Sequence, residues 1–101
     1  MKFGYFCNST NWKNLKNYNQ ILNEIREIAD YCDSKDWDSI WFSEHHFSHE
    51  GMEICPNPLM LSTDIAARTK KIRIGQAASI ITFWNPIRIA EDIALLDNLS
   101  N

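Results

Sequence analysis

A cluster of ionisable side chains follows the short apolar segment 39–42. It begins with Glu44, His45 and His46 and continues with His49, Glu50 and Cys55. An imidazole titrates near neutral pH, so a histidine of this cluster could transfer protons in an active site. It could equally have a structural role at the end of a strand, bonded to Glu44. The cluster alone leaves both interpretations open.

Metal binding is a further alternative for the same loop. His45, His49, Glu50 and Cys55 are all possible ligands, but their spacing matches no closed tetrahedral zinc site. The three cysteines of the chain contain no C-x-x-C pair. We therefore expect no metal site here.

A second segment combines small residues with aromatic ones. Gly75-Gln76-Ala77-Ala78-Ser79 offers little side-chain bulk, which suits either close packing inside a sheet or the close approach of a flat ligand. Phe83 and Trp84 follow and could form a wall for an organic substrate or simply fill space.

The remaining pattern predicts the elements that position these two segments. Three apolar runs begin about 35 residues apart, a spacing that suits a strand followed by a crossover helix. These runs are residues 2–7, 39–42 and 72–77. Helical patterns follow them at 17–34, about 58–69 and about 86–99. Asn57-Pro58 and Asn85-Pro86 each place a capping side chain before a proline and predict where the last two helices begin.

The order β-α-β-α-β-α predicts an α/β fold with a parallel sheet. Ligands of such folds bind at the carboxyl ends of the strands, where both segments would lie. Two architectures fit the pattern: a small open doubly wound sheet, or part of an eight-stranded barrel, which as a whole takes ~250 residues.

Composition excludes several classes of protein. The chain has 101 residues and a net charge of −3, and its Lys and Arg form no basic stripe, so we expect no nucleic-acid partner. No apolar run reaches the ~20 residues of a membrane-spanning helix. An odd number of cysteines favours free thiols in a reducing compartment, and we expect a cytoplasmic location.

Four segments together resemble the amino-terminal third of the bacterial luciferase-like, flavin-dependent monooxygenase family, with the alpha-type luciferase subunit as the best match. They are Met1-Lys2-Phe3-Gly4-Tyr5-Phe6, Trp41-Phe42-Ser43-Glu44-His45-His46-Phe47, Ile74-Gly75-Gln76-Ala77-Ala78-Ser79-Ile80 and the helical segment from Pro86 to Asp97. The resemblance implies a TIM (β/α)8 barrel, of which residues 1–101 would be the first three βα units. We therefore expect one incomplete domain that is inactive alone. We also expect a set of strand residues to face the barrel interior, namely Phe3, Tyr5, Ile40, Phe42, Ile72 and Ile74.

The resemblance also implies cofactors and site residues. Reduced FMN, or deazaflavin F420 in some branches, would act with molecular oxygen on an aldehyde or another small organic substrate, and a flavin reductase would supply the reduced flavin. His45 would be the acid–base residue, with Glu44 and His46 in support. Ala77 and Ala78 would form a non-proline cis peptide beneath the flavin ring.

Two further implications concern assembly and subtype. A homodimer would form through the second and third helices, near Ala66, Ala90 and Glu91. Asn85 stands where alpha-type luciferases have histidine, so light emission is not implied. A non-catalytic partner subunit of the beta type is the second alternative, but the paired histidines after Glu44 favour the catalytic type.

Overall fold

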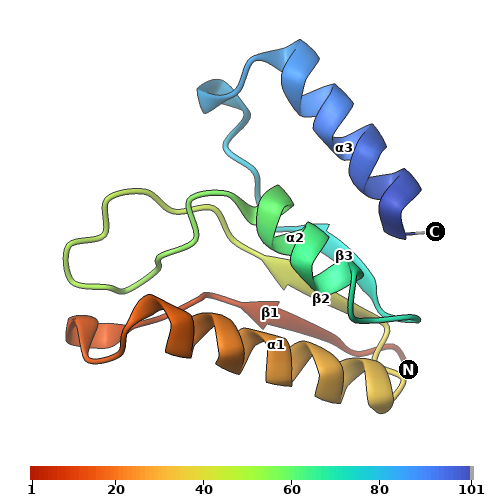
Figure 1. The fold of residues 1–101 in the computed structure, drawn as a ribbon, viewed down its shortest axis with the longest axis horizontal. Helices are drawn as coiled ribbons and strands as arrows, with labels where there is room; N and C mark the ends of the chain where they lie inside the picture. Colours follow the sequence, from red (N-terminus) through yellow and green to blue (C-terminus); the bar gives the residue numbers. More distant parts are fainter. Residues whose placement is uncertain (101) are drawn as a thin grey trace.

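The computed structural model describes residues 1–100 and contains one parallel sheet of three strands (Figure 1). The strands are β1 (Gly4–Cys7), β2 (Ser39–Phe42) and β3 (Arg73–Gln76), in the order β1-β2-β3. Tyr5 pairs with Ile40, and Ile40 pairs with Ile74. The predicted parallel sheet is confirmed.

Three α-helices alternate with the strands: α1 (Tyr18–Ser34), α2 (Pro58–Ala66) and α3 (Pro86–Ser100). Two short 3-10 helices, η1 (Trp12–Asn14) and η2 (Ile81–Phe83), lie in the loops after β1 and β3. The predicted caps are confirmed, because Asn57 Oδ1 accepts from the Met60 N–H at 2.9 Å and Asn85 Oδ1 accepts from the Ile87 N–H at 2.9 Å.

Helix α2 ends earlier than predicted, at Ala66 rather than near Thr69. The reason lies in the turn that leads to β3. The Asp33 carboxylate at the end of α1 accepts the backbone N–H groups of Lys70, Lys71 and Ile72 at 2.8 to 3.2 Å. These donors are therefore held in a turn instead of continuing the helix.

The hydrophobic core lies between the sheet and the helices. Its buried members include Ile21, Ile25, Ala29 and Cys32 of α1, Ile40 and Phe42 of β2, Leu61 and Ile65 of α2, and Ile72 before β3. Helices α1 and α2 thus cover the same face of the sheet, and α3 packs against α2 (Figure 1).

The prediction of which strand residues face the barrel interior was wrong. Ile40, Phe42 and Ile72 are buried in the core under the helices. Tyr5 and Ile74, which pair with Ile40 on the same face of the sheet, pack against that core as well. The uncovered face of the sheet carries the alternate residues of the strands, among them Phe6 and Trp41, which are 52% and 42% exposed.

Two ion pairs join α1 to α2 and to the turn that follows it. The Arg26 guanidinium donates to both carboxylate oxygens of Asp64 at 2.7 and 3.0 Å. The Arg68 guanidinium donates in the same way to Asp30 at 2.9 and 2.8 Å.

Helix α3 is less enclosed, and several of its apolar side chains are exposed: Ile87, Ile93, Leu95 and Leu99. None of the helices within residues 1–100 has the length and apolar character needed to cross a membrane.

Candidate functional site

All three loops that follow the strands lie at one end of the sheet (Figure 1). This arrangement follows from the parallel strands, whose carboxyl ends share one edge. The loop after β2, residues 43–57, brings the ionisable cluster to this edge, and the loop after β3 brings the small and aromatic residues.

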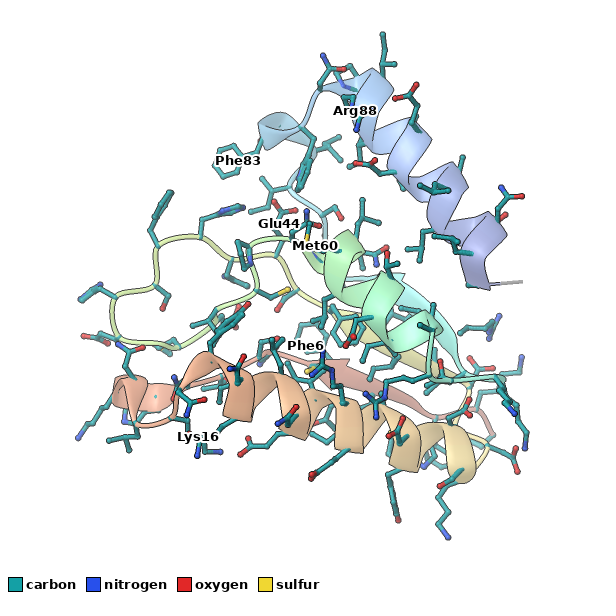
Figure 2. All side chains as sticks on the ribbon, in the orientation of Figure 1. Phe6, Lys16, Glu44, Met60, Phe83 and Arg88 are labelled. Atoms are coloured by element: carbon teal, nitrogen blue, oxygen red, sulfur yellow. The ribbon has the colours of Figure 1, made fainter. Side chains whose placement is uncertain are left out.

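Glu44 joins these two loops (Figure 2). Its side chain is fully buried, and Oε1 lies 2.8 Å from Nε2 of His46. From the other loop, the Ile80 N–H donates to Oε2 at 2.7 Å and the Trp84 indole N–H donates to Oε1 at 3.0 Å. A buried carboxylate needs such donors, and Glu44 receives them from both sides.

The charge of Glu44 is stabilised by the same contacts. Burial alone would raise the pKa of this carboxyl, but the hydrogen bonds from His46, the Ile80 N–H and the Trp84 indole outweigh burial and lower the pKa below its ordinary value. Glu44 is therefore an anion at neutral pH and acts as an acceptor that holds the loops together.

The two neighbouring histidines have different partners. His46 is held by Glu44, and its ring meets that of Phe83 edge-on, with 5.1 Å between the centroids. Nε2 of His45 instead contacts the carboxylate of Glu53 in the same long loop. The structure thus brings Glu44 and His46 together, whereas His45 is separate and half exposed.

The long loop is fixed to the loop after β1. The Asn11 N–H donates to the Gly51 carbonyl at 2.6 Å, and the Lys13 N–H donates to the Glu50 carbonyl at 2.9 Å. Gly51 has a φ of +70°, and an added Cβ would lie 2.1 Å from the Asn11 carbonyl oxygen. Only glycine fits this close approach. The two loops therefore form one joined rim.

The Ala77–Ala78 peptide bond is cis, as the family resemblance implies. The Ala77 N–H donates to the Phe42 carbonyl at 2.8 Å, so the bond directly follows the last pairing of β3 with β2. Both alanine side chains are exposed. A role for Ala77 and Ala78 in cofactor binding stays a prediction.

Trp41 lies across β3 at Gly75, on the uncovered face of the sheet. A Cβ at Gly75 would be 2.5 Å from two carbons of the indole ring, so the glycine makes room for this side chain. The Trp41 indole N–H donates to Ser39 Oγ at 2.9 Å and fixes the ring. Gly75 therefore serves close packing, one of the two alternatives for the small-residue segment.

The cysteines offer no reactive thiolate. Cys7, Cys32 and Cys55 are free and buried, and burial raises the pKa of each, to about 11 for Cys55. Within residues 1–100, no three His, Cys, Asp or Glu side chains converge in a way that could hold a metal ion.

Two side chains at this edge were not predicted from the sequence. The aromatic character of Trp84 predicts only a hydrophobic wall or a space filler, but a half-buried indole also needs an acceptor for its N–H, and this need points to Glu44. Glu53 carries no local signal, because its proximity to His45 depends on the turn at Gly51.

Comparison with known proteins decides the family. The sequence model described as "Luciferase-like monooxygenase" matches residues 1–101. The chain belongs to the luciferase-like monooxygenase family. Among curated members, it is 31% identical over 101 residues to the oxygenase component of a flavin-dependent trigonelline monooxygenase from Acinetobacter baylyi, covering 100% of this chain and 28% of that protein.

Alkanal monooxygenase chains of the alpha and beta types are also relatives of this chain. It is 38% identical to the alkanal monooxygenase beta chain of Photorhabdus luminescens, covering 99% of this chain and 30% of that one. It is 30% identical to the alpha chain of the Kryptophanaron alfredi symbiont, covering 99% of this chain and 27% of the relative. The chain thus spans less than a third of the length of these relatives.

A solved structure agrees with the assignment. The oxygenating constituent of 3,6-diketocamphane monooxygenase from Pseudomonas putida, a type II Baeyer-Villiger monooxygenase in complex with FMN, superposes with a TM-score of 0.89 at 25% identity. The match covers 99% of this chain and 27% of that structure.

Proposed function

We propose that residues 1–101 form the first three βα units of a TIM (β/α)8 barrel that works as a flavin-dependent monooxygenase. It would use reduced FMN and molecular oxygen to oxygenate an aldehyde or another small organic substrate, with a flavin reductase as the source of reduced flavin. The family membership and the FMN complex of a structural neighbour support this proposal. The observation that carries the proposal is that Glu44 joins two loops at one edge of the sheet. One is the loop after β2 with its ionisable side chains, and the other is the loop after β3 that contains the cis peptide bond.

The residues present fit a flavin. A flat ring system needs apolar surface with little side-chain bulk, and Ala77 and Ala78 provide small exposed side chains at the strand ends. Trp41 and Phe83 supply exposed aromatic surface. Ser43 Oγ, at the end of β2, is buried without a hydrogen-bond partner among residues 1–100 and could serve a polar group of the ligand. When bound, the flavin supplies the oxygen-transfer chemistry.

The protein residues then have separate tasks. His45 would give or take a proton near the flavin and substrate, because it is the half-exposed histidine at the end of β2. Glu44 and His46 would hold the rim in place, since both are engaged with each other. Phe83 and Trp41 would help to keep water from the reacting atoms.

Replacing His45 tests this function. In the full-length protein, supplied with reduced FMN, oxygen and a panel of aldehydes and ketones, His45→Ala should lower turnover by about 10²-fold or more. Far-UV circular dichroism should be unchanged, because the His45 side chain is half exposed. His49→Ala is the matched control: its side chain is 91% exposed, and turnover should be unchanged. Normal turnover of the His45 variant on every substrate would contradict the proposal.

Two alternatives are tested by the same assay. The 38% identity to a luciferase beta chain favours a non-catalytic partner subunit as the second candidate. That candidate predicts no turnover by the protein alone and restored turnover only when a second, catalytic subunit is added. Replacing FMN with deazaflavin F420 distinguishes the oxidoreductase alternative, which would be active with F420 and independent of oxygen.

A further inference from the structure

We propose that Trp41 is a specificity-determining residue: its indole ring limits how far the apolar end of a substrate can reach below the strand ends. The inference rests on the proposed function, in which the uncovered face of the sheet is the inside of a barrel, and it names the side chain that sets the length of the substrate.

The indole ring of Trp41 is held across the sheet by its neighbours. A Cβ at Gly75 of β3 would lie 2.5 Å from two carbons of the benzene side of the ring. A Cβ at Gly4 of β1 would lie 3.4 Å from the indole nitrogen and 2.7 Å from Ser39 Oγ, the atom that accepts from this nitrogen at 2.9 Å. The ring therefore extends from the β1 side to the β3 side of β2, in space that two glycines leave free.

Only small side chains stand between this ring and the strand ends on β2 and β3. Side chains alternate along a strand, so the next residues on the same face are Ser43 after β2 and Ala77 after β3. Ala77 continues the pairing of these strands, because its N–H donates to the Phe42 carbonyl at 2.8 Å. The interior of a TIM barrel is packed in layers of side chains, and Trp41 belongs to the layer directly below Ser43 and Ala77. A ligand that enters from the strand ends therefore meets the indole, which is 42% exposed.

The surface at this depth suits hydrocarbon. Phe6 of β1 pairs with Trp41 and is 52% exposed on the same face. The one polar group of the indole, its N–H, already has an acceptor in Ser39. The ring thus offers no further hydrogen bond, and an apolar group of the substrate would contact it while the reactive group stays at the strand ends. A rigid ring at a fixed depth discriminates by length, because a longer chain collides with it.

Ligands of graded length test the inference. In the full-length protein with reduced FMN and oxygen, kcat/KM is measured for straight-chain aldehydes and methyl ketones of increasing length. Binding of the corresponding unreactive primary alcohols is measured by calorimetry, with and without oxidised FMN. Trp41→Leu should raise the ratio of kcat/KM for long over short substrates by about tenfold or more, which is the discrimination that a methylene group can produce in an apolar pocket. The alcohol affinities should shift in the same direction.

Gly75→Ala is the opposite perturbation. Its Cβ needs the place that the ring occupies, and the backbone of Gly75 does not have a positive φ, so the ring is what must move. The indole would be pushed off the sheet, and the preference should shift toward shorter ligands. Ser39→Ala removes only the hydrogen bond to the ring and should give a smaller shift toward longer ligands, which keeps the test open if Trp41→Leu does not fold.

Trp37→Leu is the matched control for the loss of an indole ring. Trp37 precedes β2 at the other end of the strand and packs beside Tyr5, so the length preference should be unchanged. An unchanged preference in Trp41→Leu and Gly75→Ala would overturn the inference while wild-type turnover still supports the proposed function. Weaker FMN binding without a change in length preference would also overturn it. Shifted alcohol affinities in a protein that turns over no substrate would support the role of Trp41 and refute the proposed function.

Discussion

Glu44→Gln is the substitution that most directly tests how the site is built. The change keeps the size of the side chain but replaces one acceptor oxygen with an amide donor. In the wild type, Oε1 faces His46 and the Trp84 indole, and Oε2 faces the Ile80 N–H. Whichever way the amide is placed, its NH2 group meets at least one donor. One buried donor therefore loses its acceptor, and the other bonds lose the help of the charge.

The size of the effect follows from these contacts. A buried donor without an acceptor costs about 1–3 kcal/mol, and hydrogen bonds to a charged group contribute about 1.5–3 kcal/mol each. We expect Glu44→Gln to lower the free energy of unfolding by about 2–4 kcal/mol, out of a total of ~5–15 kcal/mol for a domain. Urea unfolding of the full-length protein, followed by circular dichroism, measures this difference. Glu50→Gln, an exposed change in the same loop, should alter stability by less than about 0.5 kcal/mol.

The difference should depend on pH in a defined direction. Because the folded-state pKa of Glu44 is lowered, its contribution to stability is complete above the unfolded-state pKa and is lost as pH falls through the folded-state value. Wild type and variant should therefore begin to converge as pH falls below about 4.3, the ordinary glutamate pKa, and should meet only below the lower folded-state pKa. A Glu44→Gln protein as stable as wild type at pH 7, or a difference that grows on acidification, would refute the reasoning.

Three other predictions follow from the fold. Asp33→Ala removes the acceptor of the turn before β3 and should destabilise the full-length protein by about 1–3 kcal/mol, whereas Asp36→Ala at the exposed surface should have little effect in the same urea assay. Ala90→Arg should convert the proposed homodimer to monomers in analytical ultracentrifugation, and an unchanged dimer would contradict a seam at α3. A polypeptide of residues 1–101 alone, whose sheet exposes Phe6 and Trp41, should bind FMN no tighter than roughly millimolar by fluorescence titration, and micromolar binding by a cooperatively folding monomer would show the opposite.

The helix starts and the strands could be predicted because the residues that determine them are close together in the sequence. Asn-Pro at the helix starts combines a capping side chain with a preset φ, and both caps form as expected. The even spacing of the apolar runs indicated parallel strands, and the three strands are parallel. The end of α2 was not predictable in this way, because it depends on the Asp33 carboxylate, which is distant in sequence.

The faces of the strands could not be assigned for a physical reason. Segment 39–42 contains Ile40, Trp41 and Phe42 in succession, so it lacks the alternation that marks a half-exposed strand. Large apolar side chains stand on both faces, and the sequence gives no preference between them. The structure separates them: Ile40 and Phe42 lie under the helices, while Trp41 lies on the uncovered face, against Gly75.

The roles of the two adjacent histidines could not be assigned from the sequence either. In sequence, His45 and His46 both follow Glu44, and either could be its partner. In the structure, Glu44 contacts His46, and Glu44 also joins the two loops by accepting the Ile80 N–H. His45 instead contacts Glu53, which lies eight positions further along a loop that turns at Gly51. A histidine bonded to a fully buried carboxylate and packed against Phe83 has little freedom to exchange protons with a ligand. A half-exposed histidine retains that freedom, which is why we assign the acid–base task to His45 and the structural one to His46.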